Sequence, residues 1–244
     1  MSTSDWVKAG IDLLQAIISG VVVGFVIFWL DERRATRDRR LADFRIASNW
    51  NKTEPRISLR NFDLTKTNLS GRNFFKADLE STVFEKAIMW GTDFSEANLR
   101  AANFQKTNLV GVKFKAAMVY RVDFSRATIS RRTYPDIEYL PDFTNAVLHR
   151  VKFNHATIHG ASFLSANLEA ADFSHAHIWE CDFSNANLTD TKWEMANVEN
   201  CIWKNVVIGN PANYPMYLLD EIRQQNSGNT PDKNQVDSLK TATK

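Results

Sequence analysis

The sequence is poor in the residues that mark several common classes of protein. Its 244 residues include only two cysteines, six prolines and nine glycines. Two cysteines are too few for a disulfide framework, and the low glycine and proline content excludes a collagen-like or low-complexity chain. An excess of one charge is also lacking, since 30 Lys and Arg face 28 Asp and Glu. No global field therefore selects nucleic acid or an acidic substrate.

Catalytic signatures are lacking as well. The sequence contains no glycine-rich nucleotide loop, no HExxH, no CxxC pair and no nucleophile elbow. We therefore predict a protein that is not an enzyme and uses no cofactor.

The longest apolar run lies near the N-terminus. Residues 13–30 read LLQAIISGVVVGFVIFWL without a charge, and Ile11 extends them to about the length that spans a hydrocarbon core. Trp6 and Trp29 lie near its ends, where aromatic side chains favour the membrane interface. A signal peptide or a buried core helix fits less well, because only Lys8 is basic before the run and no small-residue cleavage site follows. We predict a short tail over 1–10 and a transmembrane helix over 11–30.

A basic segment follows this run. Residues 31–45 read DERRATRDRRLADFR and contain six arginines. Such a cluster resists translocation, so it predicts a single-pass protein of the cell inner membrane, with its N-terminus outside and the rest in the cytoplasm. We expect residues 31–56 to form a charged helical linker that ends before Pro55. Its charges either form a solvated face or attract anionic lipid headgroups.

A five-residue period runs from residue 57 to residue 208. Words such as KADLE (76–80), AANFQ (101–105) and SANLE (165–169) share one template. It has a small residue, often Asp or Asn next, then Leu or Phe, and two polar positions. A period of five fits neither a helix nor a strand. We expect the small residue and the apolar centre to point inward, while Asp and Asn cap turns.

A longer period of 20 residues overlies the short one. Three glycines follow it, namely Gly71, Gly91 and Gly111. Four basic residues also follow it, and we call them the basic ladder: Lys66, Lys86, Lys106 and Arg126. Four pentapeptides therefore make one coil, which predicts a four-sided β-solenoid of about seven coils with a rise of about 4.8 Å each. Phe recurs every ten residues, so bulky rings come from opposite sides of the interior.

These repeats resemble the pentapeptide repeat family, with nearly thirty tandem matches over residues 57–208. The resemblance implies an all-β fold, the right-handed quadrilateral β-helix, and implies little about activity. Phe62 and Arg72 stand where a small residue is expected, which predicts an irregular first coil. The phase also slips between Ile129 and Phe143, which are 14 positions apart.

That interruption is the first candidate interaction surface. Residues 130–142 read SRRTYPDIEYLPD and form either a projecting loop with a binding function or a one-residue deletion that kinks the stack. Two outward aromatic residues of the repeats are further contact candidates. The candidate residues are Arg131, Arg132, Tyr134, Tyr139, Trp90 and Trp179.

The basic ladder is the second candidate surface. Like charges one coil apart repel unless something anionic lies nearby. Asp63, Glu85 and Asp123 neutralise the ladder locally, or the ladder binds an anionic partner. Residues 57–129 hold 11 basic and 7 acidic residues, whereas residues 143–208 hold 4 and 7. The solenoid is thus positive toward the predicted membrane.

Cysteines and histidines also recur one coil apart. Cys181 and Cys201 occupy the small inward position, so we expect stacked core thiols without a disulfide. His155 and His175 lie outward with His177 close by, but a structural metal site needs more ligands, so we predict no metal. After residue 208 the period is lost. In the segment 209–244 we predict a capping helix over 214–225, followed by a disordered tail.

Two functional hypotheses follow. We favour a non-catalytic, membrane-tethered scaffold that presents the solenoid to an unknown cytoplasmic protein, with anionic lipid as a second partner and no nucleic acid. A homodimer through a solenoid end is a further option. The alternative is a DNA-mimicking topoisomerase (gyrase) protection or inhibition protein, an activity of some family members. DNA mimicry needs an acidic surface, whereas residues 57–208 hold 17 basic and 17 acidic residues.

The predicted topology can be tested with reporters fused after Lys244. A reporter that works only in the cytoplasm should be active there, because the arginines retain the following chain on that side. Activity of a periplasm-only reporter at the same position would contradict the assignment.

Overall fold

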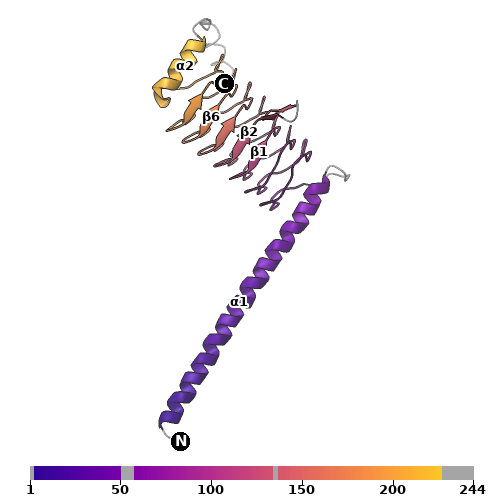
Figure 1. Cartoon of the computed structure of the whole chain (residues 1–244), viewed down its shortest axis with the longest axis vertical. Helices are drawn as coiled ribbons and strands as arrows, with labels where there is room; N and C mark the ends of the chain where they lie inside the picture. Colours follow the sequence, from indigo (N-terminus) through magenta and orange to yellow (C-terminus); the bar gives the residue numbers. More distant parts are fainter. Residues whose placement is uncertain (1–2, 51–57, 134–136, 227–244) are drawn as a thin grey trace, which may run out of the picture.

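The structure, a computed structural model of the chain, describes residues 3–50, 58–133 and 137–226. Side chains are described from residue 25 onward, except within the omitted segments and at position 212. A long helix, α1 (Thr3–Asn49), leads into a solenoid, and a short helix, α2 (Met216–Asn226), lies at its far end (Figure 1). The tail beyond residue 226, predicted to be disordered, lies outside the described residues.

Each side of a coil ends in a tight turn that the template encodes. The N–H of Ala77 donates to the carbonyl oxygen of Phe74 at 2.9 Å, and Lys76 between them has φ of 59°. This left-handed conformation at the third turn residue makes the corner. The Oδ1 of Asn73 accepts from the N–H of Phe75 at 2.8 Å, so it caps the turn as predicted.

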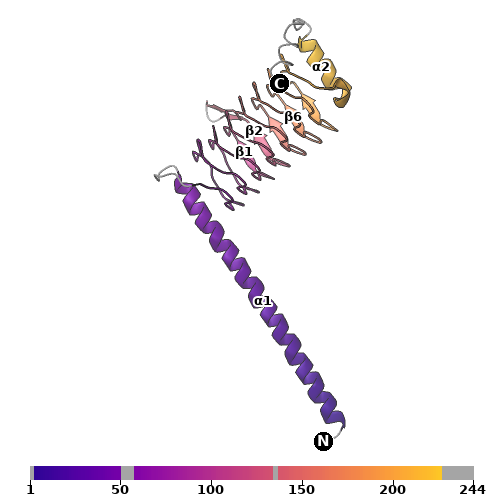
Figure 2. The same cartoon turned by 180° about the vertical axis from the view of Figure 1, so that it is seen from behind.

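Successive coils pair in parallel through their backbones. One side carries a five-stranded sheet in the order β1 (Asn108–Val110), β2 (Thr128–Ser130), β5 (Thr157–His159), β6 (His177–Trp179) and β7 (Asn197–Glu199). These strands span four turns of the solenoid, seen from behind in Figure 2. Isolated bridges continue the pairing from Asp63 to Val207, mostly at 20-residue spacing. The predicted coil length is therefore confirmed.

Two columns of stacked aromatic rings fill the interior. Within a column Phe94 lies 5.2 Å from Phe114 with nearly parallel rings, and between columns Phe104 meets Phe114 edge-on at 5.7 Å. Both geometries are favourable for aromatic pairs. The first column contains Trp50, Phe74, Phe94, Phe114, Phe143, Phe163, Phe183 and Trp203, and the second contains Phe84, Phe104, Phe124, Phe153, Phe173 and Trp193.

The two cysteines are core residues, as predicted. Cys181 and Cys201 are both buried and unpaired by a disulfide. Burial raises the pKa of the Cys181 thiol, because a thiolate would lose its hydration there. This side chain therefore behaves as a small apolar residue at neutral pH.

The end of α1 covers the first coil. Ala47 is buried in the core, and the Oδ2 of Asp43 accepts from the N–H of Asp63 at 2.9 Å. The Nη1 of Arg72 donates to the carbonyl oxygen of Ser48 at 3.0 Å. The prediction of an irregular first coil is wrong for the backbone, since Leu59 N–H pairs with Asp78 in the regular register at 2.9 Å. Arg72 replaces a small residue because it reaches the helix.

α1 is one continuous helix of 47 residues. It therefore includes most of the predicted N-terminal tail, the predicted span over 11–30 and most of the linker over 31–56, whose last residues lie outside the described range. The side chains of residues 11–24, the larger part of the predicted span, also lie outside the description. Among the residues that were described, no helix has the length and apolar character needed to cross a membrane. The structure thus does not confirm the predicted span.

The far end of the solenoid is closed by side-chain amides of α2. Gln225 accepts from the N–H of Trp203 at 2.7 Å and donates to the carbonyl oxygen of Cys201 at 2.9 Å. Asn226 likewise accepts from the N–H of Asn205 and donates to the carbonyl oxygen of Trp203, each at 2.8 Å. These amides take the place of peptide groups in a further coil, so the backbone groups of the last coil that they reach are satisfied. The predicted capping helix is confirmed.

We predict that Gln225→Ala lowers the free energy of unfolding by about 1 kcal/mol, because two backbone groups lose a partner. The measurement is denaturant unfolding of the full chain. The matched control is Arg223→Ala, which removes only an exposed contact with Asp220 at 3.5 Å and should change the stability by under about 0.5 kcal/mol. Equal effects would contradict the capping role.

Candidate functional site

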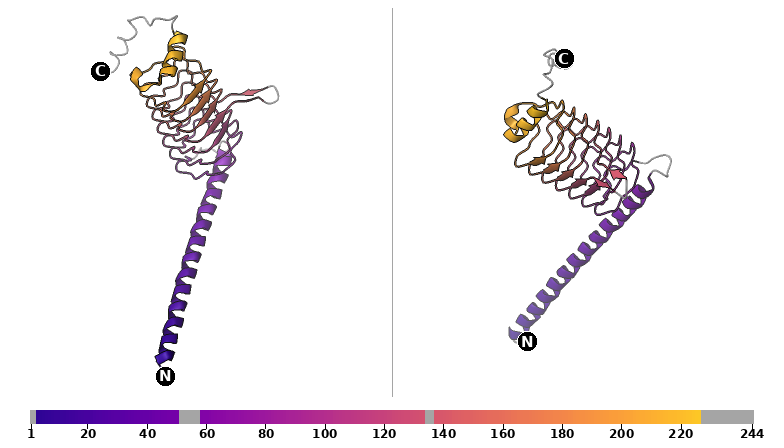
Figure 3. Two further views of the ribbon diagram at one scale, coloured as in Figure 1. Left: turned by 60° about the vertical axis from the view of Figure 1, so that its left-hand side comes forward. Right: turned by 45° about the horizontal axis from the view of Figure 1, so that its top comes forward.

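Within residues 130–142 the chain leaves the solenoid as an antiparallel hairpin, β3 (Arg132–Thr133) and β4 (Glu138–Tyr139), whereas Ser130 and Asp142 still pair with neighbouring coils. The hairpin projects from the side of the stack (Figure 3). Thr128 pairs with Thr157, 29 residues on, whereas Thr157 pairs with His177 at the usual 20. The excursion therefore adds nine residues and leaves the register unchanged above and below it. This excludes the one-residue deletion.

The base of the hairpin is fixed by Arg131. Its N–H donates to the carbonyl oxygen of His159 at 3.0 Å, and its Nη2 lies 2.6 Å from the Oε2 of Glu180. The second guanidinium nitrogen, Nη1, lies 3.7 Å from the Oε1 of Glu138 on β4. These contacts tie both strands of the hairpin to the next coils. Arg131 is thus a structural anchor rather than a free contact residue.

The corners of successive coils stack in columns, and the column beside the hairpin contains glycines. These glycines explain how closely the hairpin approaches the solenoid. A Cβ on Gly111 would lie 2.5 Å from the Cβ of Tyr139, and one on Gly160 would lie 2.5 Å from the Cδ of Arg131. Either contact would displace the hairpin. Gly71 and Gly91 lie in the same column, yet nothing is within 4 Å of their Cβ positions. Their backbone conformation does not demand glycine, because Lys76 and many others adopt positive φ at corners.

A hollow of about 540 Å³ lies between the hairpin and these two bare corners. We call it the hairpin groove, and its lining residues are Gly71, Trp90, Gly91, Val110, Arg132 and Tyr139. Trp90 is 45% exposed, and the Arg132 guanidinium carbon lies 5.1 Å from the centre of its ring. The groove therefore offers an apolar wall and, among its lining residues, one positive charge.

The structure brings together some of the sequence-predicted contact residues and separates others. Trp90, Arg132 and Tyr139 meet in the hairpin groove. Trp179 lies in β6 on the other side of the hairpin, where its ring stacks on His159 at 4.7 Å. Tyr134 lies outside the described residues. Sequence reasoning missed Gly71, Gly91 and Val110 as lining residues, although it had noted the glycine period.

The basic ladder occupies one corner column, but its members differ in their surroundings. Lys86 and Lys106 lie 3.2 and 3.4 Å from the Oε1 of Glu85, and the hydrogen bond from Lys86 lowers the pKa of that carboxyl. Asp63 instead contacts Arg40 of α1 at 3.7 Å. Of the four ladder residues, Lys66 alone lines a pocket with arginines of α1. Local neutralisation thus holds for the middle of the ladder.

Asp123, the third acidic residue expected to neutralise the ladder, has other partners. Its Oδ2 lies 3.8 Å from the Nζ of Lys152 and accepts from Gln105 at 2.8 Å. It therefore does not form an ion pair with Arg126 among the residues that the structure covers.

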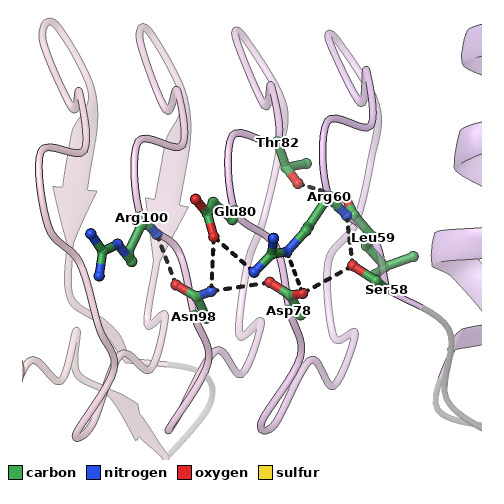
Figure 4. A network of polar contacts seen from close by, with 8 residues as sticks. All are labelled: Ser58, Leu59, Arg60, Asp78, Glu80, Thr82, Asn98 and Arg100. Carbon is green, nitrogen blue, oxygen red and sulfur yellow. Dashed lines mark hydrogen bonds and ion pairs between the residues drawn. The ribbon is translucent and has the colours of Figure 1, made fainter.

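Other charges of the first coils form a network across coils (Figure 4). Arg60 lies 2.6 Å from Asp78 and 2.9 Å from Glu80, and Asn98 donates to Asp78 at 3.1 Å. Burial alone would raise the pKa of Asp78, but the hydrogen bonds from Arg60 and Ser58 outweigh it and lower the pKa. These charges are engaged within the solenoid, so they add little to its outward field.

His155 and His175 stack face to face, with ring centres 4.7 Å apart. Within the described part of the chain, no group of three or more His, Cys, Asp or Glu side chains comes together in a way that could hold a metal ion.

Comparison with known proteins identifies the repeats. The family model described as pentapeptide repeats matches the chain in eight copies, over residues 56–91, 77–115, 92–131 and 166–202. The protein is therefore a pentapeptide repeat protein, and its β-solenoid is the fold of that family. Curated proteins gave no match to the chain.

Several solved structures are similar to this chain at low identity. HetL, a pentapeptide repeat protein involved in heterocyst differentiation regulation in the cyanobacterium Nostoc, is 24% identical, covering 62% of this chain and 86% of its own, with a TM-score of 0.23. QnrB1, a plasmid-mediated fluoroquinolone resistance protein, is 16% identical, covering 67% and 98%, with a TM-score of 0.37. A pentapeptide repeat protein of the Arabidopsis thaliana thylakoid lumen is 26% identical, covering 46% and 68%, with a TM-score of 0.27.

The glycine column allows a matched test of the hairpin contact. Gly111→Ala and Gly91→Ala both place a side chain at positive φ, at a cost of about 1 kcal/mol. Only Gly111→Ala also meets Tyr139, so it should destabilise by a further 1–3 kcal/mol or so, as overpacking does. Denaturant unfolding measures both variants, and equal losses would mean that the hairpin does not press on Gly111.

Proposed function

We propose that this protein is a non-catalytic binding scaffold that holds a segment of a partner protein in the hairpin groove. The observation that carries the proposal is the combination of a nine-residue hairpin, anchored by Arg131, with two unfilled glycine corners beside it. Excursions from a regular scaffold commonly carry binding residues. Here the hairpin supplies Arg132 and Tyr139 to the groove. The solenoid supplies the other lining residues, which are Trp90, Val110 and the two glycines Gly71 and Gly91.

The lining chemistry defines the partner segment. Trp90, Val110 and Tyr139 offer apolar and aromatic surface, and large rings of this kind dominate the energy of protein interfaces. Arg132 adds a cation at the rim, held over the Trp90 ring. At Gly71 and Gly91 a ligand backbone can approach the solenoid closely, because no Cβ intervenes. The segment that fits carries a bulky apolar side chain.

We further propose that α1 tethers this scaffold at the inner membrane with the solenoid in the cytoplasm. The support comes from the sequence, in which an uncharged run precedes six arginines. Topoisomerase protection by DNA mimicry has less support, because the charge that the hairpin places at the groove is cationic rather than acidic.

Site-specific photo-crosslinking in living cells tests the groove. A photoreactive amino acid replaces Tyr139 in the full chain and should yield one discrete cross-linked partner. Adding Trp90→Ala should reduce the cross-link about 30-fold or more, the effect expected when a central aromatic anchor worth about 2 kcal/mol is removed.

Two controls locate the contact. Trp179→Ala removes a half-buried aromatic side chain on the other side of the hairpin and should leave the cross-link unchanged. The same photoreactive group at Met118, which is 47% exposed and does not line the groove, should give no such product. A cross-link that forms equally from Met118, or that survives Trp90→Ala, would overturn the assignment of the groove.

A further inference from the structure

Helix α1 carries an unshielded apolar stretch just before its basic residues. Six consecutive side chains from Phe25 to Leu30 are exposed, by between 41% and 67%. Six residues at 100° each pass all the way round a helix, so every side of α1 is apolar here. This part of the helix extends away from the solenoid (Figure 1). No one face of a folded protein covers such a surface, whereas an apolar medium does.

A basic pocket begins at the end of this stretch, with Trp29 and Leu30 in its lining, and lies between α1 and the first coil. It encloses about 760 Å³, and its lining includes five cations, namely Arg33, Arg34, Arg37, Arg40 and Lys66, and one carboxylate, Glu32. The helical positions 29, 33, 37 and 40 share one face, and Lys66 is the corner residue of the basic ladder in the first coil. The fold thus brings together two basic features that are separate in the sequence.

The cations of this pocket have only long ion-pair contacts with neighbouring carboxylates. Arg34 and Arg37 lie 3.8 Å from Asp31 and Asp38, and Arg40 lies 3.7 Å from Asp63, all beyond hydrogen-bonding distance. The guanidinium carbon of Arg33 lies 3.6 Å from the centre of the Trp29 ring, so the two groups stack. In this arrangement the guanidinium N–H groups point outward from the edge of the stacked pair. Lys66 makes no ion pair with any residue that the structure describes. Guanidinium groups so placed suit the oxygens of a phosphate.

We propose that this pocket binds the phosphate headgroup of an anionic phospholipid, whose acyl chains lie along the Phe25–Leu30 stretch. The inference is independent of the hairpin groove and does not require α1 to cross the bilayer. A soluble phosphate shares the headgroup chemistry, but it would leave the adjoining apolar surface uncovered. The Trp29 ring sits between the two regions, as aromatic side chains do at membrane interfaces.

The test uses the full chain held in a neutral detergent and titrated with short-chain phosphatidylglycerol or phosphatidylcholine in a calorimeter. Phosphatidylglycerol should bind at least about tenfold more tightly, because each basic residue near an anionic headgroup contributes about a fivefold gain. The triple variant Arg33→Gln, Arg37→Gln and Lys66→Gln should lose on the order of a hundredfold in affinity for phosphatidylglycerol.

A charge-matched control replaces three exposed lysines of the solenoid, Lys113→Gln, Lys115→Gln and Lys192→Gln, and should retain full affinity. Both triple variants should unfold at the same temperature as the parent chain, since all these side chains are solvent-facing. Inorganic phosphate should not displace the lipid. Equal affinity for the two lipids, equal losses in the two triple variants, or displacement by inorganic phosphate at the lipid's own concentration would each overturn the lipid site.

Discussion

The backbone hydrogen bond between one coil and the next is the interaction on which the rest of this structure depends. The N–H of Phe104, for example, donates to the carbonyl oxygen of Asp123 at 2.8 Å, nineteen residues on. For this ladder to repeat, each coil must have the same length and each corner must turn in the same way, so residues such as Lys76 and Asn145 accept a left-handed conformation. The first and last coils each lack a neighbour on one side, so unpaired backbone groups remain at the two ends of the solenoid. α1 satisfies one of them through Asp43, and α2 satisfies the other through Gln225 and Asn226.

The same constraint shows where the chain is free to vary. Peptide groups pair between coils along the sides and also at the corners, where the N–H of Lys76 donates to the carbonyl oxygen of Ser95 at 3.0 Å. An insertion must therefore leave one coil and rejoin it in the same register. The hairpin leaves at the corner after β2 and returns with the pairing of β5 in place. The hairpin restricts the residues allowed at the neighbouring corners, because Gly111 and Gly160 have no room for a Cβ. Function-bearing residues can thus be added at a corner while the solenoid stays intact.

The sequence predicts those parts of the structure that repeat. The coil length, the aromatic columns, the turn-capping Asn73 and the inward Cys181 all follow from a five-residue template, because each repeat meets a copy of itself. Contacts made once leave no such signal. The contact of Arg72 with Ser48, the pairing of Asp63 with Arg40 and the approach of Tyr139 to Gly111 join segments with unrelated sequences. The sequence therefore predicts the hairpin groove only in part. It indicates the aromatic and basic lining residues, but not that Gly71 and Gly91 lie beside them.

One of the two aromatic columns begins and ends with tryptophan. Trp50, from the end of α1, lies 6.2 Å from Phe74, and Trp203 stacks at 4.6 Å on Phe183 below α2. All the rings between them are phenylalanine, which emits weakly beside an indole. The two ends of the stack therefore carry their own optical labels. A chain that keeps Trp50 alone of its seven tryptophans, and a second that keeps Trp203 alone, would report separately on fraying at either end, without any dye attached.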